Sequence, residues 1–256
     1  MNGFSAFLSK ELLQALRSMR FLIVVAAFLI LGLMNAPLAK FTPQILELAG
    51  VGEMLEGLIP PTPVAFDAWA QFFSNIAQMG ILAILLLCGP MLSWEKSKGT
   101  LVLPLTKGLG RMSVVLIKFI VMTLLWTLGL LVASLVSWGC TLVLFPGETV
   151  EYLALGIFLL WLLGVFLLAL VPLSSVLFRG SMSGLILPGA VLFIFLIALA
   201  FPNLISWNPL LLGQNSVLLL IGAAETGDFL APSLVAGITA IVTLVAALIS
   251  FRKAAL

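Results

Sequence analysis

The sequence contains no histidine, only two cysteines and few charged residues. Lys and Arg number 12 and Asp and Glu 10, so charged residues make up 9% of the chain. Soluble domains carry about 25%, and so few charges cannot cover the surface of a water-soluble domain of this size. The lack of histidine excludes Ser-His-Asp and Cys-His catalysis and histidine metal sites, and no metal site is predicted. The net charge of +2 is too small and too scattered for a nucleic-acid binder.

Apolar residues dominate instead, at 62% of the chain with a mean hydropathy of +1.29. A helix of about 20 predominantly apolar residues crosses a bilayer. Six stretches qualify, at about residues 21–38, 76–92, 114–145, 153–178, 185–204 and 234–251. We therefore predict an all-α integral membrane protein with a six-helix transmembrane domain over residues 21–256. Cys88 and Cys140 lie inside apolar runs, which predicts buried thiols rather than a disulfide.

The fifth stretch is the least regular, because Pro188 and Pro202 lie within it or at its end. Membrane helices tolerate such prolines where neighbours satisfy the freed carbonyl groups. After this stretch, residues 210–222 are apolar but too short to cross, which predicts a re-entrant or interfacial segment.

Basic and acidic residues alternate between the predicted loops. Segments 1–20, 93–113, 179–182 and 252–256 carry ten basic residues and two acidic ones, whereas 39–75, 146–152 and 205–233 carry one basic residue and eight acidic ones. Cytosolic loops are enriched in Lys and Arg. The pattern predicts a multi-pass protein of the bacterial cell (inner) membrane with both termini in the cytosol. Lys118, just inside the third span, is expected to extend its ammonium group to the same side.

Residues 1–20 have the pattern of an amphipathic helix. Its predicted apolar face consists of Phe4, Phe7, Leu8, Leu12, Leu16 and Met19, and a second face carries Lys10, Gln14 and Arg17. Such a helix lies along the lipid head groups of the cytosolic surface. It is either a simple anchor or a helix that transmits motion to the first span.

The basic loop after the second span has an ordered turn pattern. Ser97-Lys98-Gly99 is expected to end one helix, and Thr100 can cap a short new helix whose length Pro104 and Gly108 limit. We predict a short cytosolic helix between spans two and three. The alternative is a basic loop that only sets the orientation of the chain.

This loop resembles the Glu-Lys-x-x-Gly-Thr-Leu…Leu-Thr-Lys…Arg…Lys-Phe signature of the type 2 permease subunits of ABC transporters. The residues that carry the resemblance are Glu95, Lys96, Gly99, Thr100, Leu101, Leu105, Thr106, Lys107, Arg111, Lys118 and Phe119. Residues 66–68 and 71–75 resemble the family's approach to the second span, and Lys10, Glu11, Leu12 and Arg17 resemble its opening helix. Gly108 stands where the family usually has proline.

The resemblance implies a permease subunit, and it favours an exporter over an importer. Such a subunit pairs with a second permease as a homodimer or heterodimer. Each permease would bind a cytosolic ATPase subunit through the short coupling helix. The implied coupling residues are Glu95, Lys96, Gly99, Thr100, Leu101, Leu105, Lys107 and Arg111, and those of the interfacial helix are Lys10, Glu11 and Arg17. The chain contains no G-x-x-x-x-G-K-[ST] phosphate loop. ATP and Mg²⁺ are therefore expected on the partner subunit, and this chain is expected to be no enzyme and to hold no cofactor.

Several polar residues are candidates to line a transport pathway: Gln71, Ser74, Asn75 and Gln78 at the start of the second span, and Thr123 and Thr127 on the third. Contacts between neighbouring helices account for such residues equally well. No ionisable residue is predicted in mid-membrane, which disfavours the alternative of an ion-coupled carrier. A further alternative is a non-transporting assembly or immunity protein that binds a peptide or a lipid.

Overall fold

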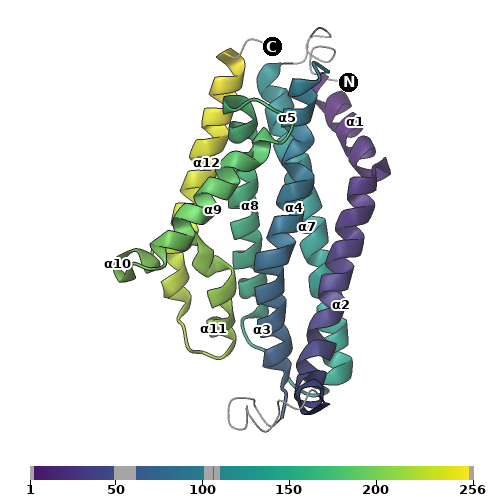
Figure 1. The fold of residues 1–256 in the computed structure, drawn as a ribbon, viewed down its shortest axis with the longest axis vertical. Helices are drawn as coiled ribbons and strands as arrows, with labels where there is room; N and C mark the ends of the chain where they lie inside the picture. The colour runs from purple at the N-terminus through teal and green to yellow at the C-terminus, as the bar shows by residue number, and fades with distance from the viewer. Residues whose placement is uncertain (1–2, 49–61, 101–105, 107–109, 254–256) are drawn as a thin grey trace.

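The structure is a computed structural model that describes residues 3–48, 62–100, 106 and 110–253. Within these residues it is all-helical, as predicted, and contains no β-strand. Five helical stretches are long and apolar enough to cross a membrane: Met19–Ile45, Ala65–Ser97, Arg111–Leu144, Leu153–Leu177 and Thr226–Arg252. They lie side by side as an elongated bundle (Figure 1). The chain thus has the features of a multi-pass membrane protein.

The first part of the bundle consists of helices α1 to α8. Their bounds are α1 Gly3–Arg17, α2 Met19–Leu48, α3 Ala65–Asn75, a π-helical turn η2 Ile76–Gly80, α4 Ile81–Cys88, α5 Pro90–Ser97, α7 Arg111–Leu144 and α8 Leu153–Leu177. Helices α3, η2, α4 and α5 follow one another along one path. Helix α2 extends beyond the predicted apolar stretch 21–38 as far as Leu48, and residues 49–61 lie outside the described part.

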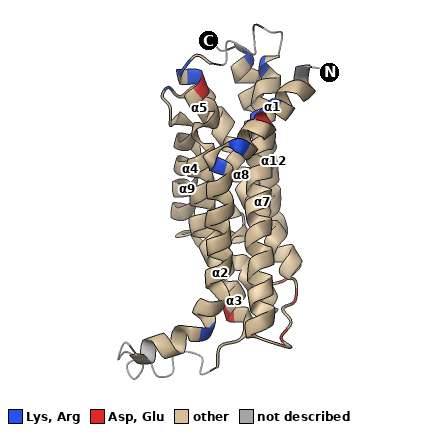
Figure 2. Cartoon of the chain, turned by 90° about the vertical axis from the view of Figure 1, so that its right-hand side faces the viewer, with Lys and Arg blue, Asp and Glu red and all other residues tan. Residues whose placement is uncertain are grey.

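The start of α1 and the end of α12 (Leu230–Lys253) lie at the same end of the bundle, here called the terminal end (Figure 1). The starts of α3 and α8 lie at the opposite end. In Figure 2 most Lys and Arg residues lie toward the terminal end, whereas the acidic residues other than those on α1 and α5 lie toward the opposite end, on α3 and in loops. The alternation of charge along the sequence therefore corresponds to a separation of charge in space.

The segment between α8 and α12 is not one long helix. It consists of η3 Ser183–Leu185, α9 Ile186–Ala198, α10 Pro202–Ile205, η4 Pro209–Leu212, η5 Gln214–Ser216, α11 Val217–Leu220 and η6 Thr226–Phe229. The apolar helical stretch Ser183–Ala198 is shorter than a span, and α10 projects sideways from the bundle (Figure 1). Pro202 has no N–H with which to continue α9. A sixth uninterrupted span at 185–204 is therefore not confirmed.

The segment predicted at residues 210–222 forms short turns that pack against the bundle. Leu212, Leu219 and Leu220 in it are buried. Asn208, just before η4, is buried too, and its Nδ2 donates to the carbonyl of Phe195 at 2.7 Å. The amide thus ties the turns to α9.

Aromatic side chains fill the middle of the bundle where glycines leave room for them. A Cβ on Gly129 would overlap the Phe28 ring, and one on Gly164 would overlap the Trp126 indole. The two rings meet edge to face at 5.8 Å between centroids. These glycines allow α2, α7 and α8 to approach one another closely.

Gly184 provides a test of close helix packing at the terminal end. A Cβ at this position would overlap the carbonyl oxygen of Gly89, whereas a Cβ on Gly189 would meet nothing within 4 Å. Backbone atoms cannot rotate away, so Gly184→Ala should destabilise the protein by about 1–3 kcal/mol. Thermal unfolding in detergent would measure this, with Gly189→Ala as the matched control. Equal unfolding temperatures for the two variants would contradict the close contact of η3 with the junction of α4 and α5.

Candidate functional site

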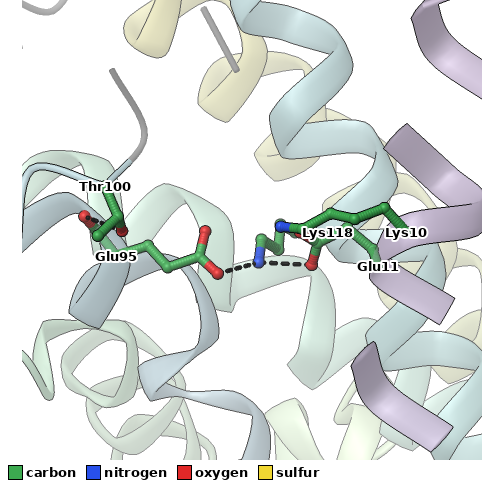
Figure 3. A network of polar contacts seen from close by, with 5 residues as sticks. All are labelled: Lys10, Glu11, Glu95, Thr100 and Lys118. Carbon is green, nitrogen blue, oxygen red and sulfur yellow. Dashed lines mark hydrogen bonds and ion pairs between the residues drawn. The ribbon is translucent and has the colours of Figure 1, made fainter. Parts of the chain in front are cut away.

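Four charged side chains meet at the terminal end of the bundle, between α1, α5 and α7. The Lys118 ammonium donates to Glu11 Oε2 and to Glu95 Oε1, both at 2.6 Å. Lys10 donates to the other oxygen of Glu11 at 2.9 Å. Figure 3 shows Lys118 lying between the two carboxylates, one from α1 and one from α5. We call Lys10, Glu11, Glu95 and Lys118 the ionic cluster.

Helix α1 presents Glu11 to the bundle through a face different from the predicted one. Phe7, Glu11 and Ala15, spaced four residues apart, are buried. Phe4, Leu16 and Met19 of the predicted apolar face are exposed instead. Residues four apart lie on the same side of a helix. The inward face is therefore centred on a carboxylate that has a cation opposite it on α7.

Three members of the cluster are shielded from solvent, whereas the side chain of Lys10 is 56% exposed. The side chains of Lys118 and Glu11 are each 2% exposed, and that of Glu95 is 16% exposed. The prediction that Lys118 extends to the membrane surface is wrong, because two carboxylates hold its ammonium inside. Burying an unpaired charge costs several kcal/mol, and here two cations and two anions compensate one another.

The cations of the cluster also shift the titration of Glu11. Burial by itself raises the pKa of this carboxyl group, but the ammonium groups of Lys118 and Lys10 outweigh burial and hold its pKa below the ordinary value of 4.5. Glu11 is therefore a carboxylate at neutral pH.

Helix α5 ends as predicted at Ser97-Lys98-Gly99. Gly99 has a positive φ of 70°, a conformation that glycine adopts without strain. The N–H groups of Gly99 and Thr100 donate to the carbonyls of Lys96 and Glu95, each at 3.2 Å. The Thr100 hydroxyl also donates to the Glu95 carbonyl, so this side chain points back toward α5. The coupling helix expected after Thr100 lies, with Leu101, Leu105 and Lys107, outside the described residues.

Lys96 binds within the chain. Its ammonium donates to the carbonyl oxygens of Ser175 at 3.0 Å and Val176 at 2.8 Å, which the end of α8 leaves without helical partners. This predicted coupling residue thus joins α5 to the end of α8. Arg111 begins α7, and Arg17 is exposed at the end of α1.

The polar residues expected along a pathway do not share one environment. Asn75 donates to the amide oxygen of the fully buried Asn35 at 2.7 Å. Gln78 donates to Ser74 at 3.0 Å and lines, with Asn215, a mostly apolar cavity of about 280 Å³ between α4, α8 and α9. Asn35 was missed in the sequence, although an amide within an apolar run is a signal of contact between helices.

The remaining candidates lie in helix contacts. Thr127 accepts a hydrogen bond from the Trp161 indole at 2.9 Å and thus joins α7 to α8. The Oε1 of Gln71 and the hydroxyl of Thr123 are buried without a hydrogen-bond partner in the part of the chain that the structure describes. Packing between helices therefore accounts for Thr127, and a continuous polar path does not follow from these six residues.

Comparison with models of known protein families gives no match for this chain, and comparison with curated protein sequences gives none either. The geometry of the ionic cluster is therefore the main observation on which a function can be argued. It connects α1, α5 and α7 through charge. One of its residues, Glu95, lies in the last turn of α5, just before segment 98–110 of the sequence.

Removing the central cation should destabilise the fold. Lys118→Met leaves Glu11 and Glu95 buried without their shared cation, which should cost about 3–5 kcal/mol. Thermal unfolding in detergent would measure the loss. The triple variant Lys118→Met, Glu11→Gln, Glu95→Gln removes all three charges and should recover most of it. Lys98→Met, a substitution at an exposed position of the same loop, should have no effect. Equal stability of the single and triple variants would contradict the electrostatic origin.

Acid should weaken the cluster through Glu11. Because the pKa of Glu11 is lower in the folded protein than the ordinary 4.5, its stabilising effect is complete above that value and is lost as pH falls through the folded-state pKa. Glu11→Gln should therefore lose less stability than the wild type between about pH 5 and pH 3. Glu151→Gln, an exposed change at the opposite end, should keep the wild-type pH dependence. Identical slopes for Glu11→Gln and wild type would be the contrary result.

Proposed function

We propose that the chain is the membrane-spanning permease subunit of a bacterial ABC transporter, and that this transporter is an exporter. The loop residues that resemble type 2 permeases support the proposal, together with the multi-pass helical fold. The observation that carries it is the ionic cluster, in which Glu95 joins the last turn of α5 to Lys118 on α7 and, through it, to Glu11 on α1. A force on the loop 98–110 would reach all three helices.

The proposal includes six membrane crossings. Helix α2 starts and α12 ends at the terminal end (Figure 1), so the number of crossings between them must be even. We propose that the broken segment 183–220 makes the crossing that the five long helices leave open. Irregular backbone is tolerated at membrane depth where protein surrounds it. The excess of Lys and Arg would place the terminal end in the cytosol.

In the proposed mechanism, a separate ATPase subunit binds the loop 98–110 and moves it when ATP is bound and hydrolysed. Packed helices respond as rigid elements rather than by continuous deformation. The movement would pass from Glu95 to Lys118 and would tilt α5 and α7 together, with α1 following through Glu11. Substrate would cross at the contact with a second permease, a copy of this chain or a different one.

An ion-coupled carrier is a second candidate, and the buried Lys118 favours it. Ionisable groups inside a helical bundle are typical of proton and ion pathways. Against this candidate, two carboxylates hold Lys118 close to one end of the bundle. In addition, α8 carries no ionisable residue, and α12 carries none before Arg252. Transport in liposomes without nucleotide would favour the carrier.

The proposed function is tested with the chain reconstituted in liposomes with the ATPase subunit that co-purifies with it. Glu95→Gln removes the charge that connects the loop to α7 but keeps the shape of the side chain. Coupling between distant sites is typically worth 5–150-fold, so this variant should reduce transport per ATP hydrolysed by at least about fivefold. Glu151→Gln is the control and should transport normally. Failure of any ATPase to co-purify, or unchanged coupling in Glu95→Gln, would contradict the proposal and leave an assembly or immunity protein.

A further inference from the structure

A polar cavity of about 200 Å³ opens beside the ionic cluster. It lies between the corner of α1 and α2 and helices α5 and α7. Its lining includes two carboxylates, Glu11 and Glu95, and two cations, Lys118 and Arg20, together with Gln14, Ser18 and Trp94. The four charges of the ionic cluster compensate one another, because Lys118 and Lys10 pair with Glu11 and Glu95. The charge of Arg20 is not part of this balance.

Arg20 is half-buried in the first turn of α2 and faces the cavity. Among the residues that the structure describes, its guanidinium makes no hydrogen bond or ion pair. A guanidinium carries five N–H donors and binds phosphate or carboxylate through two of them at once. The cavity thus holds a guanidinium with no direct partner among the described residues, because both carboxylates of the lining are paired with Lys118.

An apolar groove of about 320 Å³ adjoins the polar cavity. Its lining comes from α1, the start of α2 and the outer side of α7, and includes Leu12, Leu16, Phe21, Leu124 and Leu128. Ala15 and Leu125 line both the cavity and the groove. The polar cavity, which contains Arg20, and the apolar groove are therefore directly adjacent.

We propose that this pair of cavities binds an anionic phospholipid. The phosphate would bind Arg20 in the polar cavity, and an acyl chain would lie in the groove along α7. Trp94, which is 46% exposed, also lines the cavity, and tryptophan is enriched at the head-group level of membranes. The proposal does not depend on an ATPase or on transport, since the lipid would bind to the isolated chain.

The adjoining cavities favour a lipid over a free anion. A free phosphate needs only the polar cavity and gains nothing from the groove. A lipid uses both. Its phosphate compensates the charge of Arg20, and its acyl chain covers the apolar surface of the groove, which bulk lipid or detergent would otherwise contact. Charge selects an anionic head group, since the ionic cluster offers no unpaired carboxylate that would attract a cationic one.

Binding is measured by native mass spectrometry of the delipidated chain in detergent, with phosphatidylglycerol and phosphatidylcholine as probes. One basic residue near the membrane surface changes affinity for an anionic lipid about fivefold. Arg20→Gln should therefore bind phosphatidylglycerol about fivefold more weakly, and its loss of affinity for phosphatidylcholine, whose choline cation offsets the charge of the phosphate, should be smaller. Arg20→Lys should retain most of the preference. Arg17→Gln, the same charge change on the exposed side of α1, is the matched control and should bind like the wild type.

The groove is tested separately with substitutions at exposed positions, which should fold normally. Leu124→Trp fills the groove from a residue that is 48% exposed and should weaken binding of both lipids. Leu135→Trp, at a residue of α7 outside the lining of this groove, should not.

Four results would each overturn the proposal: unchanged binding in Arg20→Gln, unchanged binding in Leu124→Trp, an equal loss in Arg17→Gln, and displacement of phosphatidylglycerol by free glycerol phosphate at the same concentration. The last result would indicate a site for a free anion. Because no nucleotide or partner is present, these outcomes are independent of whether the chain is a transporter subunit.

Discussion

The end of the bundle that carries α1 and α5 is organised around one cation. Lys118 is buried, and its two carboxylate partners come from helices that are far apart in the sequence, at positions 11 and 95. An ammonium group in this position requires partners, because an isolated charge in an apolar interior costs several kcal/mol. This requirement constrains the rotation of α1, which presents Glu11 to the bundle together with Phe7 and Ala15, and it constrains where α5 ends relative to α7.

The bilayer imposes a second constraint, on length. Helices α2, α7, α8 and α12 satisfy it with uninterrupted apolar runs, whereas the segment after α8 does not. In that segment, prolines at 202 and 209 start new short helices rather than extend an old one. Buried hydrogen bonds replace helical ones there, as between Asn208 and the carbonyl of Phe195. Irregular backbone is thus stabilised by the surrounding protein.

The sequence predicts most of the helices and little of the site. The long helices were predictable because a soluble fold rarely contains an apolar run of about 20 residues, and the end of α5 was predictable because Gly99 has a conformation that glycine favours. The extension of α2 to Leu48 was missed because polarity marks the membrane edge, not the helix end. The pairing of Glu11 with Lys118 spans 107 residues, and no local pattern records it. Lys118 was expected at the surface because side-chain length alone permits that position, and only the tertiary fold supplies its carboxylates.

Two consecutive residues of α5 point to different parts of the bundle. Glu95 binds Lys118 on α7, and Lys96 binds the last carbonyls of α8. Successive residues on a helix are rotated by about 100°, so the last turn of α5 contacts both α7 and α8. These two helices are joined to each other by a loop at the opposite end of the bundle. A rotation of that turn by a few tens of degrees would lengthen one set of bonds while compressing the other. The last turn of α5 therefore connects α7 with α8 at the terminal end, and a change in the tilt of either helix would strain these bonds.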